Sequence, residues 1–139
     1  MKFLLDTCVI SELIKPNPNA NVVAWVSENN EDSMYLSVLT FGEIAKGIEK
    51  APSATKKKAL QSWVENDLKE RFKHKIIDLD MTVATTWGQM QGKAELAGKP
   101  MPTIDGLIAA TGIAYDCIVV TRNISDMEQS GVDLVNPWE

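Results

Sequence analysis

The chain has 139 residues and a net charge of −5, and 45% of its residues are hydrophobic and 24% charged. This length and composition predict one folded domain over residues 1–139 and exclude disorder of the whole chain. It contains no apolar run of the roughly 20 residues that a membrane span needs and no signal-peptide pattern at its start, so we expect a cytoplasmic protein with no membrane partner. A single histidine, His74, and two widely separated cysteines exclude most zinc sites and argue against a histidine-activated nucleophile.

Short apolar or β-branched runs alternate along the chain with segments of helical periodicity. In chain order, the patterns predict a strand at residues 2–5, a short helix at 9–14, a strand at 33–36, helices through 41–48 and 60–68, a strand at 75–79, helices through 83–97 and 104–111, and strands at 117–120 and 133–135. Strands separated by helices pair in parallel through right-handed crossovers. We therefore expect an α/β fold, a three-layer α/β/α sandwich around a parallel sheet of about five strands.

Four acidic side chains lie near predicted strand ends or helix starts: Asp6, Glu43, Asp105 and Asp126. Ligands of parallel α/β sheets bind outside the carboxyl ends of the strands, so the four can meet at one edge. Each also has an ordinary structural explanation. Asp6 can cap the helix that follows it, and Thr40-x-x-Glu43 matches a capping box. Asp105 suits the positive end of a helix, and Asp126 is typical of a turn. A single metal site, by contrast, explains all four positions together.

Five segments carry a resemblance to a known family: residues 4–12, which read Leu-Leu-Asp-Thr-Cys-Val-Ile-Ser-Glu, and residues 36–44, 104–111, 120–123 and 135–138. Together they resemble the PIN-domain nucleases, and within these the VapC-type and FitB-type toxins of bacterial toxin-antitoxin pairs. The resemblance spans essentially the whole chain. This family usually has Asn where Cys8 stands, and many members have Asp where Asn123 stands. Either Asn123 or Asp126 would therefore complete the acidic site.

The resemblance implies a PIN-like fold and a Mg²⁺-dependent endoribonuclease that hydrolyses RNA with a metal-activated water. An all-oxygen ligand set agrees with this, because hard ligands suit Mg²⁺, or Mn²⁺ as its substitute, better than zinc or copper. The catalytic set expected is Asp6, Glu43, Asp105 and Asp126. Within it, Asp6 and Asp105 would be the principal metal ligands, and Glu43 would hold a second ion or its water. Thr121 and Asn123 would orient the water or a phosphate oxygen.

Partners follow from charge, from apolar surface and from the resemblance. Without the four acids the net charge of −5 becomes −1, so a metal-bound chain need not repel RNA. The basic stretches at residues 56–58 and 69–75 are candidate RNA-binding surfaces, although such runs are often solvated helix faces. A homodimer is predicted from the large apolar surface of three tryptophans and of the helix face that carries Met90; the tryptophans are Trp25, Trp63 and Trp87. Membership of the family would add an antitoxin protein whose tail lies across the acidic cleft.

Two other functions are compatible with the pattern. One is a PIN-like module that has lost catalysis and acts through binding, which Cys8 and Asn123 favour. The other is a phosphoryl-transfer or receiver-type α/β domain, which also has an acid after its first strand. That class would need a second acid at Cys8 and, in a receiver, a Lys where Arg122 follows Val120-Thr121. Neither is present, so the nuclease is the preferred hypothesis.

Overall fold

A five-stranded parallel sheet forms the centre of the chain, whose computed structural model describes residues 1–139. Its strands are β1 (Lys2–Leu5), β2 (Met34–Ser37), β3 (Ile76–Ile77), β4 (Cys117–Val120) and β5 (Leu134–Val135). They lie in the order β3-β2-β1-β4-β5, and every neighbouring pair is parallel. The expected α/β/α sandwich is thus confirmed, with each strand within three residues of its predicted bounds.

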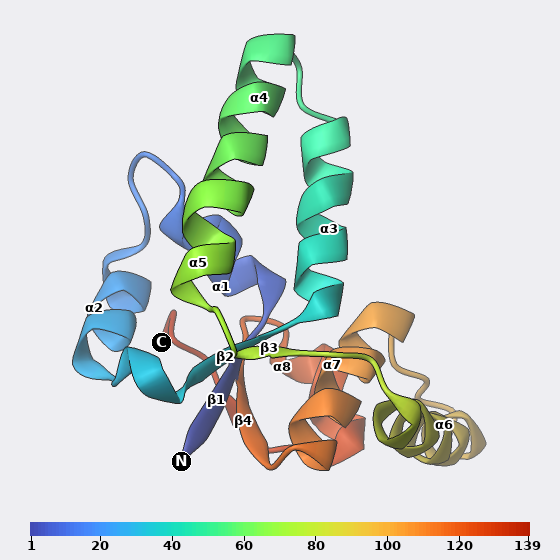
Figure 1. Ribbon diagram of the computed structural model, residues 1–139. Coiled ribbons are helices and arrows are strands. Elements are labelled where there is room, and N and C mark those ends of the chain that lie inside the picture. Colours follow the sequence, from blue (N-terminus) through green and yellow to red (C-terminus); the bar gives the residue numbers. More distant parts are fainter.

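Helices connect all the strands (Figure 1). They are α1 (Thr7–Leu13), α2 (Ala20–Glu28), α3 (Val38–Glu49), α4 (Ala54–Trp63), α5 (Lys69–Arg71), α6 (Met81–Leu96), α7 (Thr103–Ala114) and α8 (Ile124–Met127). A π-helical segment, η2 (Val64–Leu68), joins α4 to α5, and short 3-10 turns lie at η1 (Glu31–Ser33) and η3 (Glu128–Ser130). Helix α2 was not predicted. No helix is long and apolar enough to cross a membrane.

Strand β1 divides the core into two halves, because alternate residues of a strand point to opposite faces of its sheet. Phe3 and Leu5 pack with residues of α1, α2 and η2 in one cluster of buried apolar side chains. Leu4 packs on the other face with residues of α7 and α8. Helix α6 lies against α7 on that second face (Figure 1). Both faces of the sheet are therefore covered, as a parallel sheet requires.

The tryptophans face inward more than the sequence suggested. Trp25 packs edge-on against Phe3, with ring centroids 5.1 Å apart, and Trp63 packs against the same core cluster. None of the four residues from which a homodimer was predicted is among the exposed large apolar side chains. The apolar surface on which that prediction relied is thus largely used inside the chain, and the homodimer itself stays a prediction.

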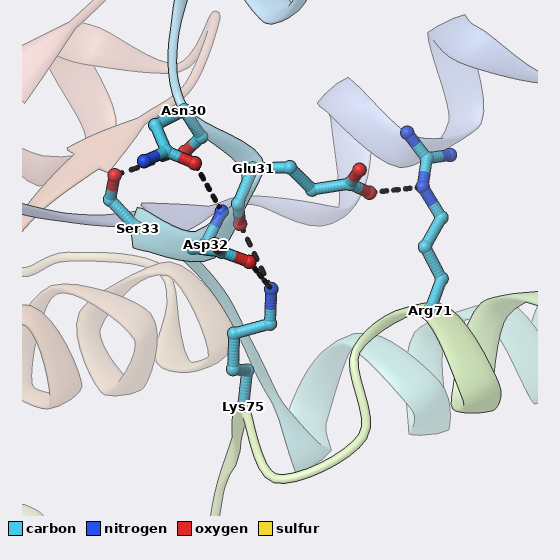
Figure 2. A network of polar contacts seen from close by, with 6 residues as sticks. All are labelled: Asn30, Glu31, Asp32, Ser33, Arg71 and Lys75. Atoms are coloured by element: carbon cyan, nitrogen blue, oxygen red, sulfur yellow. Dashed lines mark hydrogen bonds and ion pairs between the residues drawn. The ribbon is translucent and has the colours of Figure 1, made fainter.

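A polar network just before the starts of β2 and β3 includes part of the basic stretch 69–75 (Figure 2). Arg71 donates to the Glu31 carboxylate, and Lys75 Nζ donates to the Glu31 carbonyl oxygen over 2.9 Å and lies 4.0 Å from Asp32 Oδ1. These contacts tie η1 to the segment between α5 and β3. Two further ion pairs use lysines of the basic stretches, Lys69 with Glu65 at 2.6 Å and Lys57 with Glu49 at 4.0 Å. Much of the positive charge assigned to RNA binding is therefore paired within the chain.

Candidate active site at the carboxyl ends of β1 and β4

The connections from β1 and β4 leave the sheet in opposite directions, and this places a crevice outside the ends of these two adjacent strands. Asp6 follows β1 directly, and its backbone N–H donates to the Val120 carbonyl oxygen at the end of β4 over 2.9 Å. The Asp6 side chain is only 3% exposed. An ionisable group that is buried at this point of an α/β fold is a candidate functional group.

Both oxygens of the Asp6 carboxylate accept hydrogen bonds from the chain. Oδ1 accepts the Thr7 backbone N–H over 2.8 Å, which makes Asp6 the N-cap of α1 as one reading predicted. Oδ2 accepts the Thr121 hydroxyl over 2.7 Å and lies 3.7 Å from the Cys8 thiol. Burial raises the pKa of Asp6, while its bonds to Thr121, Thr7 and Cys8 act in the opposite direction. Asp6 is thus both the N-cap of α1 and a buried, hydrogen-bonded carboxylate beside the crevice.

Cys8 is partly exposed. Its thiol lies 3.7 Å from both Asp6 Oδ2 and Thr121 Oγ1. Burial, followed by the nearby Asp6 charge, raises the pKa of this thiol to about 11, so it stays protonated and can donate. The support that an asparagine would give to Asp6 is therefore supplied by Thr121 and, more weakly, by the Cys8 thiol.

Glu43 is held by Thr7, which in turn contacts Thr40, and the sequence did not reveal this role of either threonine. Thr7 donates its hydroxyl proton to Glu43 Oε1 over 2.6 Å, and the hydroxyl oxygens of Thr7 and Thr40 lie 3.1 Å apart. The capping-box reading of Thr40 and Glu43 was wrong, because α3 begins earlier: Ser37 is its N-cap and accepts the Leu39 N–H over 3.0 Å. The same spacing instead puts Thr40 and Glu43 on neighbouring turns of α3 that face α1.

Asp105 lies in the first turn of α7 and is half-buried. Burial, followed in order of effect by the negative charges of Asp6, Asp126 and Glu43, raises its pKa to about 6. The electrostatic field of the other three predicted acids therefore acts on Asp105. Asp126, on α8, is exposed and takes part in this field without a hydrogen bond to the other three.

Thr121 and Asn123 occupy the turn after β4. Thr121 is fully buried, and its hydroxyl donates to Asp6 and accepts the Asn123 backbone N–H over 2.9 Å. This geometry gives Thr121 the role of positioning Asp6. Asn123 is half-buried at the start of α8, and its side chain does not cap that helix. An orienting role for the Asn123 amide stays a prediction.

The donor chemistry of the site suits a hard divalent cation. Carboxylate and hydroxyl oxygens make up its polar groups, and the protonated Cys8 thiol is a poor ligand. No group of three or more His, Cys, Asp and Glu side chains is arranged to hold one ion in this structure. Mg²⁺ in phosphate chemistry usually takes one or two carboxylates and completes its shell with water and phosphate oxygens. That Asp6 and Asp105 are such a pair stays a prediction.

Comparison with known proteins places the site in context. A model of the PIN domain matches residues 3–128. A VapC ribonuclease from Sinorhizobium fredii, Y4jK, is 32% identical over 136 residues, which cover 98% of this chain and 97% of that protein. The toxin FitB from Neisseria gonorrhoeae is 35% identical over 135 residues and 97% of each chain. The crystal structure of FitAcB from the same organism superposes with a TM-score of 0.94 at 34% identity, covering 99% of both chains.

Proposed function

The chain belongs to the PIN-domain family, and on that basis we propose that it is a Mg²⁺-dependent endoribonuclease and the toxin of a toxin-antitoxin pair. Ribonuclease and toxin are the names of its relatives, and the site of this chain supports extending both to it. Buried Asp6 and half-buried Asp105 lie at the crevice outside the ends of β1 and β4, where burial and then the charges of Asp6, Asp126 and Glu43 raise the pKa of Asp105 to about 6. This convergence of like charges is the observation that carries the proposal, because it is costly unless a cation or a proton neutralises it.

Asp6 and Asp105 would hold the cation, and Glu43 would hold a second ion or a water. When bound, a divalent cation supplies positive charge that keeps the acids ionised, lowers the pKa of water and stabilises the leaving oxygen. Thr121 and the Thr7 N–H fix both oxygens of Asp6. Thr7 also occupies Oε1 of Glu43 and leaves Oε2 without a hydrogen bond from the chain. Glu43 Oε2 is therefore the atom assigned to receive a proton from water.

Hydrolysis of the phosphodiester exchanges one bond between phosphorus and oxygen for another. The water oxygen forms a bond to phosphorus as the bond from phosphorus to one ribose oxygen breaks, and the water proton passes to Glu43 Oε2. The leaving ribose oxygen takes a proton from solvent, so one fragment ends in a phosphate and the other in a hydroxyl. Asp105 and Asp126 add negative charge that disfavours a hydroxide and repels the RNA phosphate, so we expect this step only once a cation offsets that charge.

The cellular setting proposed is a cytoplasmic homodimer that an antitoxin inhibits. A cationic antitoxin side chain would pair with the carboxylates that would otherwise hold the cation, so the complex should cleave RNA more slowly than the free chain. Equal rates with and without the antitoxin would contradict this. Light scattering of the purified chain tests the homodimer, and a monomer at micromolar concentration would exclude it.

The nuclease is tested by incubating the purified chain with total RNA in Mg²⁺, in Mn²⁺ and in EDTA. The Asp6→Asn, Asp105→Asn double variant serves as the inactive form. Asp116→Asn is a matched control, because Asp116 lies in the turn after α7 with a φ of 56°, a conformation that Asn also tolerates. Discrete fragments from the wild type and from the control, absent in EDTA and in the double variant, are expected. Metal binding without cleavage would favour the inactive binding module.

A further inference from the structure

A hollow of about 320 Å³ lies beside Glu43, between the first turns of α3 and the start of α7. Figure 1 shows these two helix ends next to each other. Val38, Leu39, Gly42, Glu43, Lys46 and Ile104 line this α3–α7 hollow. Its volume lies at the lower end of the ~300–1,000 Å³ range of small-ligand pockets. Because Glu43 belongs to both the hollow and the acidic centre, whatever fills the hollow touches the catalytic cleft.

The hollow presents apolar surface to solvent at an otherwise acidic site. Ile104, which directly precedes Asp105, is 37% exposed although it is apolar. Gly42 leaves the floor open, since no atom lies within 4 Å of the position that a Cβ would take there. Val38 and Leu39 are only partly buried. A flat apolar group could lie on this floor and against Ile104.

A free cation stands at the rim of the hollow. Lys46 follows Glu43 by one helical turn, is exposed, and takes part in none of the ion pairs of the chain. An ammonium group in this position can contact a phosphate next to the one at the acidic centre. The combination of apolar floor and nearby cation matches one nucleotide, with its apolar base faces and its charged phosphate.

We propose that the α3–α7 hollow binds the base of the RNA nucleotide next to the cleaved phosphate, and that Lys46 contacts the adjoining phosphate. The inference rests on the proposed nuclease function and adds to it a base subsite. Sequence-specific recognition of RNA takes place mainly on single strands, whose unstacked bases can enter such a pocket. The α3–α7 hollow is therefore the place where this chain would select its cleavage sequence.

The hollow on the other side of the acids does not fit a base. It has a volume of about 290 Å³, and its lining includes Ser125, Asp126 and Glu128, with Lys99 as its one cation. Two carboxylates there would repel phosphate, and Met101 is its one hydrophobic lining residue apart from prolines. The lining of the two hollows therefore favours the α3–α7 hollow, beside Glu43, as the one that binds the base.

Gly42→Leu is the variant that fills the hollow. Leu is a better helix former than Gly, and the open space at Gly42 accepts it, so α3 should stay folded. Gly88→Leu is the matched control, because Gly88 lies in α6, also has no atom within 4 Å of an added Cβ, and does not line either hollow. The two changes are chemically identical and differ only in their distance from the site.

Binding is measured by fluorescence anisotropy with a short fluorescein-labelled single-stranded RNA of random sequence. The Asp6→Asn, Asp105→Asn background prevents cleavage and removes two repelling charges. We expect Gly42→Leu to weaken binding about tenfold and Gly88→Leu to leave it unchanged. Lys46→Gln should lower the dependence of log Kd on log salt concentration by about 0.7, the value for one phosphate contact on a single strand. Lys50→Gln, one turn farther along the same helix, should not.

Cleavage supplies an independent readout. The wild type and Gly42→Leu, each with its acids intact, are incubated with an RNA library of random sequence, and the cut ends are sequenced. A base preference beside the cut that Gly42→Leu abolishes supports the subsite, and an unchanged preference overturns it. Weaker binding by Gly42→Leu combined with no cleavage by the wild type would keep the subsite and reject the nuclease. Unchanged RNA binding with a changed oligomeric state would overturn the subsite and assign the hollow to a second copy of the chain.

Discussion

The Thr121 hydroxyl donates a hydrogen bond of 2.7 Å to Asp6 Oδ2, and this contact joins the end of β4 to the end of β1. The two residues are far apart in sequence and both are buried. The bond does two things at once. It satisfies a buried carboxylate, which would otherwise be costly, and it fixes the direction of the Asp6 oxygens toward the crevice.

Thr121→Val should therefore lower both stability and activity. Loss of a hydrogen bond to a buried carboxylate should cost about 2 kcal/mol of the free energy of unfolding. The misplaced Asp6 should lower the cleavage rate of the folded protein by about tenfold to a hundredfold. Urea unfolding and cleavage of a labelled RNA measure the two effects. Thr111→Val is the control, because Thr111 is buried too but bonds only to the Leu107 carbonyl oxygen within α7. A full cleavage rate in folded Thr121→Val would refute the positioning role.

Thr7→Val should release Glu43 while leaving Asp6 capped, because the Thr7 backbone N–H remains. We expect kcat to fall about tenfold with little change in KM, since Thr7 orients the Glu43 carboxylate that is assigned to proton transfer. Steady-state kinetics on a short labelled RNA give both constants. Thr82→Val, the same change on the exposed first turn of α6, should leave both unchanged. A rise in KM at constant kcat would move Glu43 to a binding role.

Without metal, ionised Asp105 should destabilise the folded chain. Its pKa is about 6 in the folded protein against an ordinary 3.8, so the folded chain binds the proton more tightly and loses stability as pH rises between these values. Asp105→Asn should therefore be more stable than the wild type above pH 6 in EDTA, by about 1 kcal/mol after allowance for solvent screening. The difference should disappear near pH 4. Urea unfolding at pH 8 and pH 4 measures it, and equal stabilities at pH 8 would show that ionised Asp105 carries no such penalty.

Divalent metal should reverse this penalty. A cation that binds only the folded chain stabilises it by about 2.7 kcal/mol when its concentration is a hundred times Kd. Mg²⁺ and Mn²⁺ should thus raise the Tm of the wild type and of Asp116→Asn, but not of the Asp6→Asn, Asp105→Asn double variant. Thermal unfolding followed by circular dichroism is sufficient. Equal shifts in all three proteins would place the ion elsewhere on the surface.

Most of the fold could be read from the sequence because its strands are short, apolar and separated by amphipathic helices. Helix α2 was missed although Val22, Trp25 and Val26 have helical spacing and Asn19 caps its start. The helical spacing was present in the sequence, but the prolines and asparagines just before it are typical of turns and loops. The capping-box error at Thr40 has a different cause: Ser37, three residues earlier, offers an equally good cap, and the sequence does not rank the two.

The acids of the site were predictable by type and position, whereas their supports were not. Thr7 and Glu43 are separated by 36 residues, and only the packing of α1 against α3 brings their side chains within 2.6 Å. Thr121 was expected to face water or phosphate, and the structure uses its hydroxyl on Asp6. Rotamers and burial decide such contacts, and neither is encoded in local spacing. The α3–α7 hollow was likewise invisible, since Ile104 reads as a helix core residue in the sequence.

The most direct test of the acidic centre follows bound Mn²⁺ by electron paramagnetic resonance and RNA cleavage in the same titrated samples. We expect cleavage to rise with the first equivalent of ion bound by the wild type, and both signals to be lost in the Asp6→Asn, Asp105→Asn double variant while Asp116→Asn retains them. Cleavage that persists in EDTA, or that survives in the double variant with its fold intact, would contradict a metal-dependent centre at these carboxylates.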